Sequence, residues 1–542
     1  MPASIDLTLH WLDILVIVAY LAMLLLIGSF HYRRQSNLTD FFLAGREMRW
    51  FVVGASLMAA LNSGIDYLMQ PSAMIKFGVY TMVGNLSWLL LYPYVFFVTL
   101  PLYRRMDVIS AYEYLERRFS IGVRTLTAGI FILWRLGWLA TALYVPALAL
   151  SVVTGNQVSA VTLIVGIGTI VTLYTMMGGI RAVIWTDLVQ FFIMFTGLAV
   201  TIVIVLRNVD GGFMEIIGNW DQIGKEAITR LSGVAVDGGL VSKVTGYFLI
   251  PMTLTGVFMA TMVSRLTTYT SDQVMVQRFQ TSRTIRDARQ GFVITAVSDV
   301  VWMLALAFIG LALFTYFQAS LGGLPDWALD HPDQIYPYFM SQVFPIGMTG
   351  LVMAAILAAS LSSIDSAINA VTSVVMVDFY RRLFRGETIG SEDKSEGADR
   401  RQVRVSRVIT LLVGITGIIL SCNVSKLGSL IEIANKLINS FTGPILGIFL
   451  LGMFTRRANA QSVLIGGTIG VLVTLFVAFQ EQIYGLFKLQ ADEYISFLWP
   501  STFGFLATFL IGYGSSFVSG SSGSEKAREW NWFSVTSRKL EE

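Results

Sequence analysis

Cysteine, histidine and charge are all scarce in this chain. Its 542 residues include one cysteine and three histidines. A single cysteine excludes an intramolecular disulfide, and no Cys/His cluster is present that could form a zinc site. There is no glycine-rich P-loop, so we do not expect ATP to be the energy source on this chain. There is also no visible pair of nucleophile and base, so an enzyme is not expected. We expect no nucleic-acid partner and no obligate protein partner.

Charged residues make up only 13% of the chain, whereas soluble globular proteins carry about twice that share. Hydrophobic residues make up 55% and gather in long runs. A helix needs roughly 20 mostly apolar residues to cross a bilayer, whereas barrel strands are short and alternate, so a β-barrel is excluded. The runs predict about thirteen membrane-spanning helices. They cover 12–31, 50–74, 79–101, 122–153, 158–178, 182–206, 245–275, 290–317, 345–376, 406–422, 426–454, 461–481 and 494–517.

Arginines cluster in alternate connections between these runs. The arginine-rich segments are 33–49, 104–118, 278–289, 381–407 and 456–457. Because cytoplasmic loops carry the excess of Lys and Arg, this pattern places the N-terminus outside and the C-terminus in the cytoplasm of a multi-pass plasma-membrane protein.

Two of the runs contain signals for broken helices. The second holds the polar triplet Asn62-Ser63-Gly64, and the seventh holds Thr253, Gly256 and then a polar stretch from 264 to 271. Unwound segments at matching positions of two halves are typical of transporters built from inverted repeats. Glycine alone is common in membrane helices, so it is the pairing that favours a transporter.

Several motifs resemble the solute:sodium symporter family, which transports sugars, proline, sialic acid, vitamins and monocarboxylates with sodium. The motifs are DFFLAGR at 40–46, GASL at 54–57, GGIRAVIWTD at 178–187, QR at 277–278 and AASLSS at 358–363. They follow one another in the family's order along nearly the whole chain. AYEYLERRFS at 111–120 and YVPAL at 144–148 look most like the iodide, multivitamin and monocarboxylate branch.

This resemblance implies an all-α polytopic membrane protein with a LeuT-type core of two inverted five-helix repeats. The segments would be an extra N-terminal helix at 12–31, a first repeat at 50–206, a second repeat at 245–454, two C-terminal helices at 461–517 and a cytoplasmic tail at 518–542. The resemblance also implies secondary active transport by alternating access, in which sodium drives the solute.

Carried over from the family, one sodium site lies between the broken second run and the ninth run. Its ligands would be the carbonyls of Ala59, Asn62 and Ala359 and the hydroxyls of Ser362 and Ser363. The spacing of the last three residues puts them on one helix face. The structural alternative is that these serines bond to their own helix or help helices to pack closely.

A second, less common ion site of the family would use Asp187 with Ser362, Asp365 and Ser366. Asp365 departs from the small hydroxyl residue usual there. Two nearby carboxylates bind a cation or share a proton, so Asp365 puts the sodium:solute ratio in doubt. The alternative is a salt bridge between Asp365 and a nearby arginine.

The solute site is expected from polar residues at mid-membrane depth, where charge is costly and usually functional. Alignment with the sodium–sugar members gives Asp66, Asn85, Trp138, Arg265 and Asp299, and Arg135 is added because it lies one helical turn from Trp138. Two arginines suit a carboxylate better than a neutral sugar. We therefore expect a small organic anion, such as a monocarboxylate, or a zwitterion. The alternative is that the arginines and aspartates pair with one another and never contact the solute.

The leading hypothesis is a sodium:solute symporter whose ligands are a small-molecule solute and co-transported sodium within the lipid bilayer. A sodium-coupled sugar transporter, a sensory protein of the same fold and an uncoupled facilitator are the alternatives. The identity of the solute is not fixed by the sequence.

Overall fold

The computed structural model describes residues 9–31, 38–106, 108–223, 246–328, 331–387, 396–424, 436, 440–488, 494–519 and 525–538. Within these ranges the chain is helical, and its one isolated backbone bridge joins Met48 to Ser282. Nine helices in the described part are long and apolar enough to span a membrane, and two shorter apolar helices accompany them. The first part of the predicted run 426–454 and parts of the tail 518–542 lie outside the described residues.

The helices follow the predicted runs closely. The first half contains α1 (Trp11–His31), α2 (Leu38–Leu43), η2 (Ala44–Arg46), α3 (Trp50–Leu61), α4 (Gly64–Phe77), η3 (Gly78–Ser87), α5 (Trp88–Tyr94), η4 (Val95–Thr99), α6 (Leu100–Arg104), α7 (Glu113–Arg118), α8 (Ile121–Val153), α9 (Ala160–Asn208), α10 (Gly212–Gly218) and η5 (Asn219–Asp221). The second half contains α13 (Leu254–Ser271), α14 (Gln273–Thr281), α15 (Ile285–Leu321), η6 (Asp326–Ala328), η7 (Pro332–Gln334), α16 (Ile335–Val343), α17 (Met348–Val374), η8 (Val375–Phe384) and α18 (Glu396–Ser421). The last helices are α20 (Thr442–Phe454), α21 (Ala460–Ala478), α22 (Gln480–Leu486), α23 (Pro500–Val518), α24 (Glu525–Glu529) and α25 (Trp532–Thr536).

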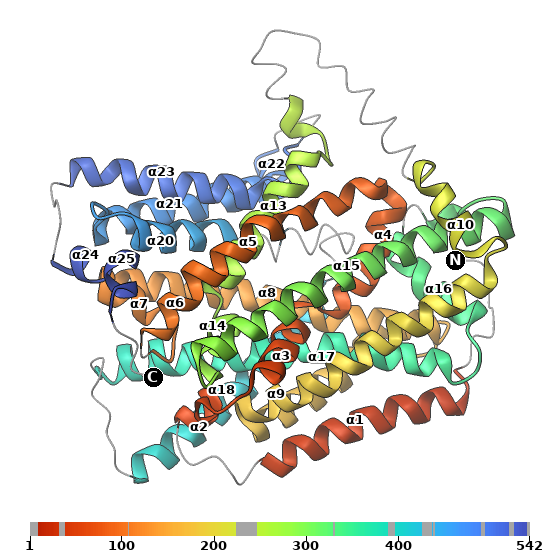
Figure 1. The fold of residues 1–542 in the computed structure, drawn as a ribbon, viewed down its shortest axis with the longest axis horizontal. Coiled ribbons are helices and arrows are strands. Elements are labelled where there is room, and N and C mark those ends of the chain that lie inside the picture. Colours follow the sequence, from red (N-terminus) through yellow and green to blue (C-terminus); the bar gives the residue numbers. More distant parts are fainter. Residues whose placement is uncertain are drawn as a thin grey trace.

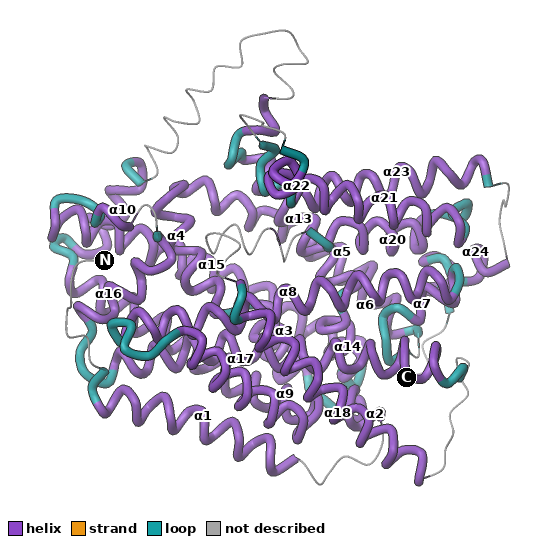
Figure 2. The backbone as a smooth tube through the Cα atoms, turned by 180° about the vertical axis from the view of Figure 1, so that it is seen from behind, coloured by secondary structure: helices purple, strands orange, loops and turns teal. Residues whose placement is uncertain are grey.

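Helix α17 is the central element of the bundle. It packs against α9, α8, α1 and α3, and almost every one of its residues is buried. Small residues such as Ala355, Ala359 and Ser363 let its neighbours approach closely, as in other membrane helix interfaces. Figure 1 shows α1 along one edge and α20, α21 and α23 stacked together at the opposite edge. The reverse view in Figure 2 shows the same arrangement.

The break predicted in the second run is confirmed. Helix α3 ends at Leu61 and α4 begins at Gly64, and the intervening Asn62 and Ser63 have extended backbone. The side chain of Ser63 accepts from the N–H of Ile65, and Asp66 accepts from the N–H of Ser63 at 2.7 Å. This capping box starts a new helix inside what would otherwise be a continuous span.

The second break lies one residue beyond the predicted polar stretch. Helix α13 ends at Ser271, Asp272 is extended, and α14 begins at Gln273. The carboxylate of Asp272 accepts from the N–H of Val274 at 2.9 Å and so caps α14. The polar residues from 264 to 271 are instead ordinary helix, in which the hydroxyls of Thr267, Thr268 and Ser271 are satisfied by donating to carbonyls one turn back.

The fifth and sixth predicted runs join through a bend in α9. Gly179 has φ 55° and ψ −168°, a conformation that favours glycine, and it divides two helical stretches. The GGIR motif therefore forms the turn that brings Asp187 back into the protein.

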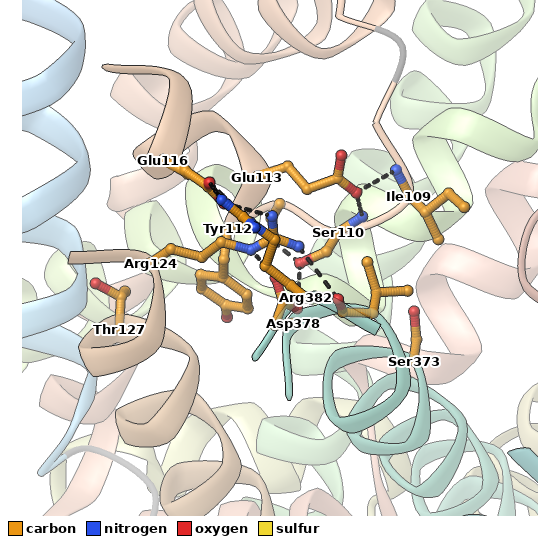
Figure 3. Close-up of polar contacts among 12 residues, drawn as sticks. Ile109, Ser110, Tyr112, Glu113, Glu116, Arg124, Thr127, Ser373, Asp378 and Arg382 are labelled. Carbon is orange, nitrogen blue, oxygen red and sulfur yellow. Dashed lines mark hydrogen bonds and ion pairs between the residues drawn. The ribbon is translucent and has the colours of Figure 1, made fainter. Parts of the chain in front are cut away.

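A polar network at the end of α17 ties its continuation η8 to α7 and α8 (Figure 3). Arg124 lies between two carboxylates, at 2.8 Å from Glu116 and 2.6 Å from Asp378. Arg382 contacts Glu116 at 2.5 Å, and the hydroxyl of Ser110 donates to Asp378 at 2.6 Å. Each of these four charges has a partner of opposite sign, so none of them is left uncompensated where the network joins the end of the central helix to α7 and α8.

The network predicts acid sensitivity. Burial raises the pKa of Glu116, but hydrogen bonds from Arg382 and Arg124 outweigh burial and hold that pKa below its ordinary value. A carboxyl with a lowered folded pKa stabilises the protein above its unfolded pKa, and this contribution is lost as pH falls through the folded pKa. We expect Glu116→Gln to melt at a lower temperature than the unsubstituted protein at pH 7, with the difference shrinking once pH drops below the ordinary glutamate value. A difference that stays constant in thermal melts from pH 7 to pH 3 would contradict this assignment.

Candidate ion and solute site

The sodium residues predicted from the sequence meet at the first helix break. Because α3 ends at Leu61, the carbonyls of its last turn lack partners within the helix. The N–H of Asn62 satisfies Met58, which leaves the carbonyls of Ala59 and Ala60 free to face α17. The hydroxyl of Ser362 donates to the carbonyl of Ala59 at 2.8 Å.

The second serine reaches the break itself. The hydroxyl of Ser363 donates to the carbonyl of Asn62 at 3.3 Å and to that of Ala60 at 3.4 Å. Ser362 also donates to Ala359 on its own helix at 3.0 Å. All these groups are buried. The arrangement gathers neutral oxygens from two helices at one point, which is the donor set that a hard cation such as sodium prefers. The carbonyl of Ala60 is an addition to the predicted set.

Asp187 does not stand free in the protein, because Arg278 pairs with it. The guanidinium of Arg278 lies 2.8 Å from Asp187 and donates to the hydroxyls of Ser56 at 2.7 Å and Ser366 at 2.5 Å. Asp187 and Arg278 are completely buried. The protein therefore supplies its own cation to Asp187. The QR motif at 277–278 contained this arginine, but sequence reasoning did not assign it to the site.

Asp365 has no ion-pair partner among the described residues. Its carboxylate accepts from the hydroxyl of Tyr174 at 2.9 Å and from Ser366 at 3.2 Å. The predicted alternative, a salt bridge between Asp365 and an arginine, is wrong here because the nearby guanidinium pairs with Asp187. Asp365 is thus a fully buried carboxylate whose polar contacts in the described part of the chain come from hydroxyls.

Two adjoining cavities of about 200 and 260 Å³ lie beside the two helix breaks. They share Asp66, Met69, Ser264 and Arg265 in their walls. Arg135 and Trp138 line the first cavity, and Asn85 lines the second. Five of the six predicted solute residues therefore face these cavities, and Asp299 lies behind them, bound to one of the wall residues.

Arg265 is paired inside the protein. Its guanidinium lies 2.9 Å from Asp299, and it donates to Ser87 at 3.1 Å and Asn85 at 3.4 Å. The indole N–H of Trp88 also donates to Asp299, at 2.6 Å. The alternative reading, in which the charges pair with one another, holds for Arg265 and Asp299.

Arg135 is paired as well, but with a carboxylate that sequence reasoning missed. Its Nε donates to Asp272 at 3.2 Å, and its Nη2 forms the ion pair with the same carboxylate. The guanidinium also lies over the rings of Trp134 and Trp138, at 4.7 and 5.3 Å from their centres. The residue at the second break thus holds the arginine in the cavity wall. Nη1 makes none of these polar contacts.

Asp66 differs from the other charged residues of the wall. It accepts the N–H of Ser63 within the capping box, and it has no ion-pair partner among the described residues. It is partly exposed and lines both cavities. The two arginines are each paired with a buried carboxylate, so Asp66 is an acidic group of this wall without a cationic partner in the described part of the chain.

Comparisons with known proteins show similarity along most of the chain. The Sodium:solute symporter family matches residues 41–470. The sodium/sialic acid symporter NanT of Aliivibrio fischeri is 28% identical over 93% of this chain and 92% of its own length. The sodium/sialic acid symporter SiaT of Proteus mirabilis is 30% identical over 85% of this chain and 88% of its own. The substrate-bound, outward-open structure of a Na⁺-coupled sialic acid symporter superposes with a TM-score of 0.79 and 26% identity, covering 95% and 99% of the two chains.

The helical bundle with two broken helices, and the oxygen cluster at the first break, define a multi-pass membrane transporter of the LeuT type rather than an enzyme. The chain belongs to the sodium:solute symporter family. It is a sodium-coupled symporter, and sodium is carried together with a small solute.

Proposed function

We propose that this symporter binds sodium at Ala59, Ala60, Asn62, Ala359, Ser362 and Ser363, and imports a small zwitterion that carries both a carboxylate and an ammonium group. The convergence of two α17 hydroxyls on unwound carbonyls of α3 supports the ion site. When sodium binds, the hydroxyls of Ser362 and Ser363 would rotate so that their oxygen lone pairs face the ion. The ion would then lie between these oxygens and the carbonyls, where the hydroxyl hydrogens had been.

The solute class rests chiefly on Asp66. A plain monocarboxylate would face an unpaired carboxylate across a small cavity, which costs free energy in a poorly solvated site. An ammonium group placed against Asp66 removes this cost. The carboxylate of the same solute would bind Nη1 of Arg135, since a guanidinium can serve two acceptors at once.

Sodium and solute would act on the same helix break. The N-terminus of α4 carries Ser63 and Asp66, and the C-terminus of α3 carries the ion-binding carbonyls. Sodium binding would fix the position of α4 relative to α3 and so preorganise Asp66 for the solute, which gives coupled binding.

A second cation would bind at Asp365, beside Ser362 and Ser366. Among the described residues, the polar groups that contact the buried carboxylate of Asp365 are hydroxyls, whereas Asp187 already has its arginine. In this proposal Asp187 orients the site through Arg278 and does not itself bind the ion.

The test is thermal stability of the purified protein, with matched solutes, in sodium and in potassium. The pairs are L-proline with tetrahydrofuran-2-carboxylate, L-alanine with L-lactate, and 4-aminobutyrate with 4-hydroxybutyrate, with sialic acid added because the relatives bear its name. We expect the amino member of at least one pair to stabilise the protein in sodium only, and its partner to bind at least about 30-fold more weakly.

Two variants separate the parts of the proposal. Asp66→Asn keeps an oxygen for the N–H of Ser63 but should erase the preference for the amino member. Ser363→Ala should weaken sodium binding by about 10-fold or more, since it removes an ion ligand. It should also lower stability in potassium by about 1–3 kcal/mol, because the buried carbonyls of Ala60 and Asn62 lose the donor that they have without sodium. If sialic acid or lactate binds in sodium while no amino compound does, the proposal that the solute is a zwitterion is contradicted, and the proposal of sodium-coupled binding stands. If nothing depends on sodium, the ion site is wrong.

A further inference from the structure

A third cavity, of about 410 Å³, lies away from both the sodium residues and the solute cavities. Arg49, Arg181 and Arg283 line it together with Glu47 and the indole of Trp185. These residues come from the start of α3, the bend of α9 and the connection between α14 and α15. None of them contributes to the ion or solute site, so the cavity calls for a separate explanation.

A tight turn after α2 builds one wall of this cavity. Ala44, Gly45 and Arg46 all have left-handed backbone, with φ of 51°, 65° and 58°. Such a run is costly for residues with side chains, and the surrounding contacts must hold it. Here the backbone of Met48 pairs with Thr281 and Arg283, and Arg181 donates to the carbonyl of Ala44 at 3.2 Å.

The cavity has an excess of positive charge. Arg181 lies 2.8 Å from the carboxylate of Glu47, so these two charges offset each other. Arg283 donates through its Nε to the backbone carbonyl of Glu47 at 2.7 Å, which carries no formal charge. Arg49 and Arg283 are both exposed, and no carboxylate pairs with either in the described part of the chain.

Exposed aromatic residues place the cavity at the edge of the membrane. Trp185 is 42% exposed, and so is Trp50, which follows Arg49 at the start of α3. Phe51 is 36% exposed and lies against Phe192 on α9. Tryptophan is enriched where membrane helices meet the headgroup region, with its apolar ring toward the acyl chains. We therefore expect the guanidiniums to lie at the depth of lipid phosphates.

We propose that this cavity binds the headgroup of an anionic phospholipid from the surrounding bilayer. The phosphate would contact Arg49 and Arg283, since guanidinium forks match phosphate oxygens, and Trp185 would cover the glycerol backbone. The bound lipid would join the start of α3 to the connection that follows α14. Both of these segments continue into the broken helices of the transport site.

The experiment measures binding of phosphatidylglycerol to the full chain by native mass spectrometry, with phosphatidylcholine as the neutral comparison. The test variant is Arg49→Gln/Arg283→Gln. The matched control is Arg286→Gln/Arg404→Gln, which removes two exposed arginines that do not line the cavity. Glycerol phosphate is added separately, because it offers the same phosphate without acyl chains.

We expect the test variant to bind phosphatidylglycerol about 30-fold more weakly, since each basic side chain near an anionic lipid contributes roughly fivefold. The control should change less than about twofold, and glycerol phosphate should not compete. Equal loss in both variants would show a general surface charge effect and overturn the site. Competition by glycerol phosphate at similar concentrations would overturn the lipid as the ligand.

Discussion

We expect Arg278→Met to lower the free energy of unfolding by about 3–5 kcal/mol, the usual cost of leaving a buried charge without its partner. Arg278 and Asp187 are both fully buried and lie 2.8 Å apart. The same guanidinium also donates to Ser56 on α3 and Ser366 on α17. The substitution therefore removes one cation and three contacts that join α14 to three other helices. Thermal unfolding of the purified protein in detergent would show the loss.

A second variant distinguishes the loss of the charge of Arg278 from the loss of its packing. In Arg278→Met/Asp187→Asn the carboxylate that the arginine paired with is removed as well, so we expect much of the stability to return, because the amide costs far less to bury than a carboxylate. Arg286→Met, at an exposed position, serves as the control and should change stability little. A double variant no more stable than Arg278→Met would mean that the shape of the arginine, and not its charge, stabilises the four helices.

The sequence predicted the helices and the first break well because both depend on local signals. Long apolar runs mark the spans, and the polar triplet Asn62-Ser63-Gly64 marks a place where a helix must restart. The second break was misplaced by one residue. The break itself occurs at Asp272, whose carboxylate both caps α14 and pairs with Arg135 on α8. The capping pattern is visible locally, but the partner is not.

The partners of the charged residues could not be read from the sequence. Arg265 and Asp299 are separated by 34 positions, and Arg278 and Asp187 by 91, so only the fold decides which charges meet. The prediction that charged residues gather near mid-membrane needs only their cost in lipid. To decide which charged residue is left to bind a solute, one must know which of the others form ion pairs. Once those ion pairs are known, Asp66 is the residue left over.

We expect Gly64→Ala to weaken sodium binding on the order of 10–100-fold, as changes next to metal ligands commonly do. A Cβ at Gly64 would lie 2.0 Å from the hydroxyl oxygen of Ser360 and 2.9 Å from the backbone carbonyl of Ile356. The serine can rotate, but the carbonyl belongs to α17 and cannot. The start of α4 must therefore move away from α17, and this displaces the carbonyls of Ala60 and Asn62 from Ser363.

The measurement is the sodium concentration that gives half of the full thermal stabilisation, with stability in potassium recorded alongside. Gly129→Ala is the matched control, because nothing lies within 4 Å of a Cβ built there, so it should leave the sodium response unchanged. Adding Ser360→Ala to Gly64→Ala removes the nearer obstacle only, so we expect partial recovery. Full recovery would show that the backbone of α17 does not limit the approach. An unchanged sodium response in Gly64→Ala would mean that close contact between α4 and α17 is not what holds the ion, and the oxygen cluster at the first break would then be packing alone.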